Sequence, residues 1–290
     1  MAQDKEISAL FMLLDDPDEE VFSAVSQKLV SYGTPIIPEL ESLWENTGSA
    51  PIQERIEQVI HRLQFGDLKK DFEKWASGEQ PELLFGAYLV TRFVYPECDA
   101  SPMLSEVEKI RRNIWLELNS YLTPLEKINI VIGILYRFHK YNGIEIAYTN
   151  PADFLVNKLI ETKKGNSFSM GILFIVLCQL LDLPVYAMMF PRQFVLGYFD
   201  DTVDFNDKEE NNFNRIKFFI DPVFGNVVTH RDVETFFKKI SVPPTAVYFR
   251  PLTNKRIIQS LIYEMVKCYE KPGDTTRQDE LLELAQLLDQ

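Results

Sequence analysis

Helical periodicity dominates the first quarter of the chain. Apolar residues recur every three or four positions through residues 6–63, which is the spacing of amphipathic helices. Asp15-Asp16-Pro17 ends the first helix, and Gly33 supplies the left-handed residue that often follows a helix end. Thr34 before Pro35 is a typical cap and first-turn pair. The pattern predicts four helices, in ISALFMLLDD, DEEVFSAVSQKLVSYG, TPIIPELESLWENT and PIQERIEQVIHRLQF.

The same periodicity continues to about residue 183. Thr123, just before Pro124, is the predicted cap of one of these helices. The last of them, residues 168–183, is almost entirely apolar, which predicts burial on all sides. The helices expected in this part of the chain are residues 67–78, 81–96, 104–120, 123–144 and 168–183.

The pattern changes after residue 183. Short β-branched and aromatic stretches, PVYAMMF, QFVLGYF and RIKFFID, predict three strands. The acidic, Asn-rich connection at residues 200–214 predicts a mobile, solvated hairpin loop. Two further helices, joined by Pro272-Gly273-Asp274, close the chain. The order predicts an α+β fold in which a buried helix leads into a small antiparallel sheet, flanked by all-α segments.

Charge and composition narrow the function classes. The 290 residues carry a formal net charge of −13, with a pI near 4.8. Such a protein is repelled by phosphate backbones and by anionic bilayers, which argues against nucleic-acid and membrane partners. The N-terminus lacks the features of a signal peptide, and the apolar stretch at residues 168–183 is too short to cross a bilayer.

Three cysteines, Cys98, Cys178 and Cys268, lie far apart in the sequence. Their spacing predicts free thiols in a reducing compartment, and therefore the cytoplasm, rather than a disulfide framework or a zinc site. The chain has neither a His-x-x-His motif nor a carboxylate–histidine cluster, so we expect no metal and no cofactor.

Residues 150–222 resemble the SirB-type branch of the transglutaminase-like superfamily. The matching text is NPADFLVNKLIETKKGNSFSMGILFIVLCQLLDLPVYAMMFPRQFVLGYF, followed by FIDPVFG. YLVTRFVYPECD resembles the upstream segment of that family, and the closing helical pair resembles its tetratricopeptide-like tail. The similarity covers roughly residues 80–290. It implies a transglutaminase-like (papain-like) core of a helix and an antiparallel sheet.

The N-terminal helices resemble a HEAT-like repeat, in which an Asp-Pro turn joins two helices. These resemblances imply three segments. Residues 1–65 form a HEAT-like segment, residues 66–250 the transglutaminase-like domain, and residues 251–290 a tetratricopeptide-like hairpin. Within the middle segment, residues 66–149 form a helical lead-in and residues 150–250 the helix-plus-sheet core.

Active members of the superfamily use a Cys-His-Asp triad. The resemblance places the three positions on Ser167, Gln193 and Asp221, so only the third keeps its residue type. A serine hydroxyl requires a base during nucleophilic attack, and the carboxamide of Gln193 cannot act as one. A base contributes roughly a hundredfold to ten-thousandfold in rate. We therefore expect no catalytic residues, and interpret Ser167 as a helix cap.

Other residues could restore catalysis. His230, in VVTHRDVETFF, is the candidate base, although capping by Thr229 or Asp232 makes a surface position the expected one. Cys178 is expected to be a buried, inert thiol. His139 is expected to interact with a helix dipole, and His61 to be exposed.

Three neighbouring features have structural interpretations. Gly225 is predicted to have a positive φ, Met188-Met189-Phe190 to fill the core, and Arg192 to be solvated.

Three functions follow from these features. The first is a catalytically inactive scaffold or interaction module that binds a protein partner through its helical flanks or its vestigial cleft. The second is an amide-bond hydrolase or acyltransferase that uses Ser167 with a base such as His230. The third is a structural protein without a functional cleft. The sequence leaves the oligomeric state open.

Overall fold

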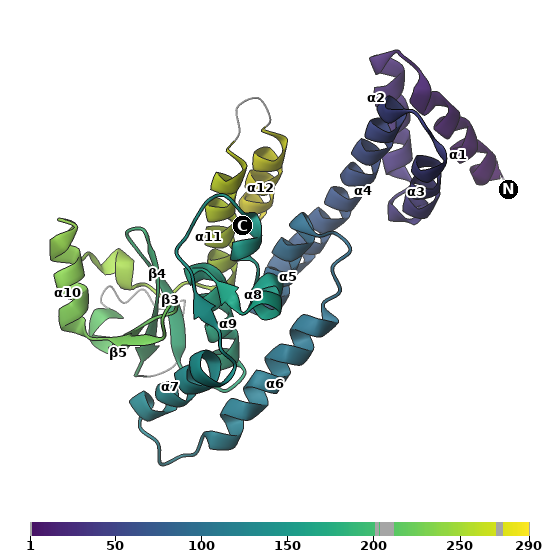
Figure 1. The fold of residues 1–290 in the computed structure, drawn as a ribbon. Helices are drawn as coiled ribbons and strands as arrows, with labels where there is room; N and C mark the ends of the chain where they lie inside the picture. The colour runs from purple at the N-terminus through teal and green to yellow at the C-terminus, as the bar shows by residue number, and fades with distance from the viewer. Residues whose placement is uncertain (1, 201–202, 204–211, 271–274, 290) are drawn as a thin grey trace. The chain divides into compact units, whose positions relative to one another are not determined.

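The computed structural model describes residues 2–200, 203, 212–270 and 275–289 (Figure 1). The chain divides into two compact units, residues 1–74 and 75–290, with the boundary near the end of helix α4. The predicted loop at residues 200–214 lies largely outside the described residues, as does the predicted turn at residues 272–274.

The first unit is helical. Arg55 on its longest helix donates hydrogen bonds to the carbonyls of Leu14 and Asp16, and its guanidinium lies 2.8 Å from a carboxylate oxygen of Glu19. These contacts hold the turn after the first helix. The elements are α1 (Ala2–Met12), η1 (Leu13–Asp15), α2 (Glu19–Ser31), η2 (Thr34–Ile36), α3 (Ile37–Asn46) and α4 (Ala50–Ala76). Their shared core consists of Leu14, Phe22, Val25, Leu29, Ile36, Leu40, Ile56, Val59 and Leu63.

Two sequence expectations in this unit are wrong. Residues 51–65 and 67–78 were predicted as separate helices, but α4 runs unbroken through Gly66. A single glycine without a proline weakens a helix by only about 1 kcal/mol, which neighbouring turns tolerate. Thr34 does not cap α3, because Thr34–Ile36 forms a short 3-10 turn that precedes it. Gly33 does have the predicted positive φ, at 79°.

The second unit surrounds a four-stranded sheet. Its helices are α5 (Leu83–Val94), α6 (Ser101–Glu117), α7 (Pro124–Ile132), α8 (Val156–Thr162), α9 (Ser167–Gln179), α10 (His230–Lys239), α11 (Asn254–Val266) and α12 (Thr276–Leu287). The sheet strands are β3 (Val185–Phe190), β4 (Gln193–Phe199), β5 (Ile216–Asp221) and β6 (Asn226–Val228). Short elements complete the unit: η3 (Gly133–Phe138), β1 (Asn142–Gly143), η4 (Pro151–Phe154), β2 (Lys164–Gly165), η5 (Asn212–Arg215), η6 (Ala246–Phe249) and η7 (Lys267–Tyr269).

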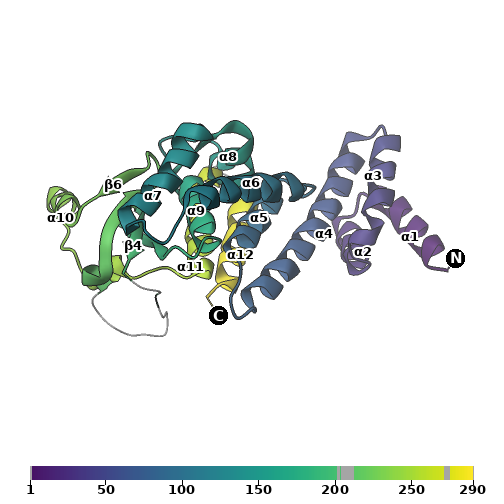
Figure 2. The same ribbon diagram turned by 90° about the horizontal axis from the view of Figure 1, so that it is seen from below.

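The sheet is antiparallel with the order β3-β4-β5-β6. Helix α9 lies on one face, between the sheet and helices α5, α6 and α8 (Figures 1 and 2). The aromatic core formed by Phe190, Phe219, Phe237 and Phe249 covers the other face, where α10 and η6 pack. The predicted α+β class is therefore confirmed, with its helix-plus-antiparallel-sheet core and its helical N-terminal and C-terminal segments.

Helix α9 is buried because its sequence is apolar all round, as predicted. Every residue from Ser167 to Cys178 is buried, so this helix forms the centre of the unit. Across the parts of the chain that the structure covers, no helix combines the length and the apolar character that a membrane crossing requires.

Candidate functional site

The site begins at the N-terminus of α9. Asn166 is fully buried, and its side-chain oxygen accepts hydrogen bonds from the amides of Phe168 (2.9 Å) and Ser169 (3.2 Å). Asn166 is therefore the helix cap, and the interpretation of Ser167 as the cap is wrong. Ser167 is the first helical residue, where a side-chain oxygen is not required for capping.

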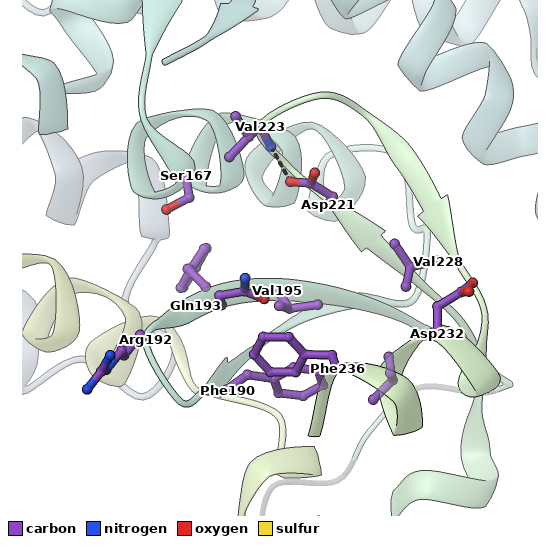
Figure 3. Close-up of a pocket in the computed structure, with 12 residues that line it drawn as sticks. Ser167, Phe190, Arg192, Gln193, Val195, Asp221, Val223, Val228, Asp232 and Phe236 are labelled. Atoms are coloured by element: carbon purple, nitrogen blue, oxygen red, sulfur yellow. Dashed lines mark hydrogen bonds between the residues drawn. The ribbon is translucent and has the colours of Figure 1, made fainter. Parts of the chain in front are cut away.

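A pocket of about 280 Å³ brings the three predicted positions together (Figure 3). Ser167 comes from α9, Gln193 from the start of β4 and Asp221 from the end of β5. Figure 3 shows Ser167 and Asp221 on one side of strand β4, with Phe190 and Phe236 on the opposite side. The full lining consists of Ser167, Phe190, Arg192, Gln193, Phe194, Val195, Asp221, Val223, Val228, Asp232, Val233 and Phe236.

The register of the sheet explains why a cavity opens here. Pairing between β4 and β5 ends at Leu196 with Ile220, so residues 193–195 pair only with β3. Beyond Ile220, Pro222 cannot donate a hydrogen bond, and the chain leaves the ladder. The gap between the start of β4 and the end of β5 is the pocket.

Two hydrogen bonds fix the turn that follows Asp221. Its Oδ1 accepts a hydrogen bond of 2.8 Å from the amide of Val223. The carbonyl of the next residue, Pro222, accepts a hydrogen bond of 2.6 Å from the hydroxyl of Tyr136. Burial raises the pKa of the Tyr136 phenol, and the negative charge of Asp221 raises it further, so the hydroxyl stays protonated and remains a donor. Gly225 completes the turn with a φ of 67°, as predicted.

The remainder of the lining is mostly apolar. Phe190 stacks on Phe236 with ring centroids 6.3 Å apart, and Val228 and Val233 lie beside them. Met188 and Phe190 are buried in the core as predicted, whereas Met189 is only half-buried. Phe190 also forms part of the pocket wall. This lining suits an apolar side chain.

The polar lining residues have distinct partners. Asp232 forms a capping box with Thr229 at the start of α10, and these hydrogen bonds lower the pKa of its carboxyl. Arg192 is exposed, as predicted, and makes no ion pair with any described residue. It has a φ of 62° in the turn between β3 and β4, a conformation that L-residues adopt only at some strain.

His230 does not line the pocket in the described part of the chain. Its ring lies edge-on to two aromatic rings, with centroid distances of 4.8 Å to Phe213 and 5.3 Å to Phe219. Its Nε2 lies 3.3 Å from the carbonyl oxygen of Phe213. Thr229 caps α10 just before it, as the sequence predicts. The structure thus brings Ser167, Gln193 and Asp221 to one pocket, whereas the half-buried ring of His230 packs against Phe213 and Phe219.

The other candidate groups lie elsewhere. Cys178 is fully buried, and burial raises the pKa of its thiol, in agreement with an inert residue. His61 is half-buried and stacks on Phe65 rather than being exposed. Within the described residues, no three His, Cys, Asp or Glu side chains gather in a way that could hold a metal ion.

A partly buried polar cluster precedes the site, and no local sequence pattern predicts it. Glu106 of α6 lies 2.8 Å from the ammonium of Lys163 and 3.4 Å from Nδ1 of His139. The Lys163 ammonium also donates to the hydroxyl of Tyr141 at 2.8 Å. His139 therefore contacts side chains of α6, including Asn113 at 3.0 Å, rather than the predicted helix dipole alone. The cluster anchors the segment that leads into Asn166.

The residues that line the apolar half of the pocket were also missed. Val228, Val233 and Phe236 come from β6 and α10, which follow the matched strands. Strand β6 is only three residues long, which is too short to show the alternation of apolar residues that identifies a strand. Periodicity could identify α10 as amphipathic, but not which cavity it faces.

Sequence comparison places the chain among known proteins. The sequence profile of the transglutaminase-like superfamily matches residues 101–262, more than half of the chain. A UPF0162 protein of Buchnera aphidicola from Acyrthosiphon pisum is 25% identical over 134 residues, covering 45% of each chain. Its counterpart from Schizaphis graminum is 23% identical over 129 residues, covering 44% of this chain and 43% of that protein.

A third UPF0162 protein, of Buchnera aphidicola from Baizongia pistaciae, is 22% identical over 157 residues, covering 53% of this chain and 54% of that one. The chain therefore spans about half the length of the curated relatives it matches. No solved structure matches it at a significant level. From the profile match, together with the helix-plus-sheet core and the pocket at its centre, the chain belongs to the transglutaminase-like superfamily.

Proposed function

We propose that this chain is a catalytically silent, SirB-type transglutaminase-like protein whose pocket binds a segment of a protein partner. The observation that carries the proposal is the composition of the pocket. It joins Ser167, Gln193 and Asp221 to an apolar cavity, and its described lining includes no imidazole, thiol or lysine amine. A carboxamide at the position of the base cannot accept the proton of Ser167 during attack.

The same pocket has the properties of a binding site. Apolar walls with a few convergent polar groups are typical of ligand pockets. The volume of about 280 Å³ is slightly smaller than the range of roughly 300–1,000 Å³ that is usual for sites of drug-sized ligands. It therefore favours one or two side chains of a polypeptide over a large cofactor.

The helical flanks support an interaction role. We propose that residues 1–65 are a HEAT-like segment, residues 66–250 the transglutaminase-like domain and residues 251–290 a tetratricopeptide-like hairpin. The shared core of α1–α4 and the packing of α11 against α12 are consistent with helical repeats, which often form concave binding surfaces. Three free cysteines, Cys98, Cys178 and Cys268, fit a location in the cytoplasm.

The alternative, a hydrolase or acyltransferase that uses Ser167 and His230, requires His230 to reach the pocket. Its contacts with Phe213 and Phe219 and the absence of its side chain from the described lining weigh against that role. A general base must lie within hydrogen-bond reach of the proton it removes. The binding function is therefore favoured.

A capture experiment tests the proposal. Affinity-tagged full-length protein is incubated with native lysate, beside a Val228→Trp variant that fills the cavity and a Val247→Trp control. Val247 is 60% exposed in η6 and does not contribute to the described lining. We expect one defined partner to be retained by wild type and by the control and to be lost with Val228→Trp. Equal retention by all three proteins would contradict a role for the pocket.

A further inference from the structure

One main-chain position in the sheet lacks its partner. The amide of Phe199 donates a hydrogen bond of 2.8 Å to the carbonyl of Pro184, which precedes β3. Because main-chain groups point to alternate sides along a strand, the odd-numbered residues of β4 direct their N–H and C=O groups toward β3. The even-numbered residues, Phe194 and Leu196, therefore face β5. Leu196 pairs with Ile220, but the ladder ends there, and the position opposite Phe194 belongs to Pro222.

Pro222 cannot fill that position. Proline has no amide hydrogen for the carbonyl of Phe194. Its own carbonyl is occupied by the hydroxyl of Tyr136 at 2.6 Å. Among the described residues, the N–H and C=O of Phe194 thus have no hydrogen-bond partner, and Phe194 lines the pocket. Main-chain groups next to a cavity need partners, and a bound polypeptide supplies both a donor and an acceptor.

The unpaired part of β4 is limited to the main chain of Phe194, and this short length determines what can pair with it. Pairing resumes at once with Leu196 and Ile220, so an added strand cannot continue inward past Phe194. A strand that enters from the turn at Arg192 must therefore end inside the pocket. The occupant is a chain terminus rather than the middle of a segment.

The charges at the two ends select which terminus fits. Asp221 lies at the inner end, next to the resumed ladder, and Arg192 lies at the outer end in the turn (Figure 3). A chain antiparallel to β4 places its first residue beside Asp221 and runs outward past Arg192. A parallel chain would place its terminal carboxylate beside the carboxylate of Asp221, where the two charges repel. The charges therefore favour an N-terminus.

We propose that the pocket binds the N-terminal residue of a partner polypeptide, an inference that rests on the proposed function. The α-ammonium group pairs with Asp221, and the first main-chain groups pair with Phe194. An apolar first side chain occupies the cavity beside Phe190 and Phe236. At about 3.3 Å per extended residue, the second or third side chain reaches Arg192, which selects an acidic residue there.

Peptide binding tests this inference. The probes are six-residue peptides with a C-terminal fluorescein. Their first residue is Leu, Ile, Met or Phe, and their second and third residues are Ala or Glu. Each is prepared with a free and with an acetylated N-terminus, and fluorescence anisotropy is measured with the full-length protein. We expect acetylation to weaken the best peptide at least tenfold.

Matched variants locate the contacts. Asp221→Asn should weaken the free peptide at least tenfold and abolish its advantage over the acetylated one, whereas Asp182→Asn, the same change on an exposed residue outside the lining, should have no effect. Arg192→Gln should remove the preference for Glu over Ala, whereas Arg231→Gln should retain it. Hydrogen exchange at the Phe194 amide should slow on peptide addition, while the Gly197 amide, which faces β3, serves as the reference.

Two outcomes overturn the inference. Equal binding of free and acetylated peptides would exclude recognition of the α-ammonium group, and failure of every peptide to bind would exclude N-terminal capture as a whole. Neither outcome decides the proposed function, which the capture experiment tests separately. A partner that is lost only with Val228→Trp would still show that the pocket binds a protein, by a mode other than N-terminal recognition.

Discussion

The hydroxyl of Tyr136 donates a hydrogen bond of 2.6 Å to the carbonyl of Pro222, a residue 86 positions away in the sequence. This contact joins η3 to the end of the central sheet. It also fixes the carbonyl of Pro222, which stands between the pocket-lining residues Asp221 and Val223. Tyr136 is therefore a structural determinant of the site, although it does not line the described cavity.

Replacement of this tyrosine tests that role. In Tyr136→Phe the Pro222 carbonyl loses its donor, so we expect the free energy of unfolding to fall by about 1–2 kcal/mol. Urea denaturation measures the change. Tyr121→Phe is the control, because Tyr121 is 95% exposed. A loss no larger than that of the control would show that solvent replaces the bond without cost.

The cap of α9 gives a second prediction. Asn166→Ala removes the acceptor for the amides of Phe168 and Ser169, so we expect a loss of about 1 kcal/mol in stability. Ser167→Ala removes no capping bond and should change stability by less than about 0.5 kcal/mol. Thermal and urea unfolding of the two variants compare them directly. A larger loss of stability in Ser167→Ala than in Asn166→Ala would indicate that Ser167 is the cap.

The sequence predicts the core elements well, because burial leaves a strong local pattern. The stretch from Ser167 to Cys178 is apolar without interruption, and the three predicted strands coincide with β3, β4 and β5 within one residue. The positions of Ser167, Gln193 and Asp221 came from the resemblance to a known family, and the structure brings them to one pocket.

The rest depended on long-range contacts that leave no local pattern. Asn166 and Ser167 are both acceptable caps by residue type, and the difference lies in which side chain reaches the free amides. The pairing of Glu106 with Lys163 spans 57 positions, and the pocket wall formed by Phe236 depends on how α10 docks. The opening between β4 and β5 follows from one proline, whose effect appears only once the register is known.

The cluster around His139 predicts a pH dependence of stability. Burial lowers the pKa of His139 below its ordinary value of 6.5; Glu106 opposes this effect, while Lys163 and Lys109 reinforce it. The neutral ring is thus favoured in the folded protein. As the pH falls through 6.5, the unfolded chain takes up this proton more readily, so the free energy of unfolding decreases.

We therefore expect stability to fall between pH 7.5 and pH 5.5, and His139→Gln to show a shallower decline. Burial raises the pKa of Glu106, but the hydrogen bonds and charges of Lys163 and Lys109 together bring it below its ordinary value. Its contribution is lost only at more acidic pH, below the ordinary value of 4.5, and so does not confuse the comparison. His61→Gln is the control. An unchanged slope in His139→Gln would assign the dependence to other groups.

The three thiols should differ in reactivity. Burial raises the pKa of Cys178, which is fully buried, and raises that of the half-buried Cys268 to about 11. Because the thiolate is the reactive form, native protein treated with iodoacetamide should be modified slowly at Cys98 and Cys268 and not at Cys178. Peptide mass spectrometry follows each site. Early modification of Cys178 would mean that α9 opens locally in the folded protein.

The central claim is that the pocket binds without catalysis, because Ser167 has no base. The most direct measurement is covalent labelling of the native protein by a fluorophosphonate probe, followed by mass spectrometry of the peptide that contains Ser167. We predict no labelling above that of the Ser167→Ala variant. Stoichiometric labelling of Ser167 that disappears in Ser167→Ala would contradict the claim, and its loss in His230→Gln as well would identify the missing base.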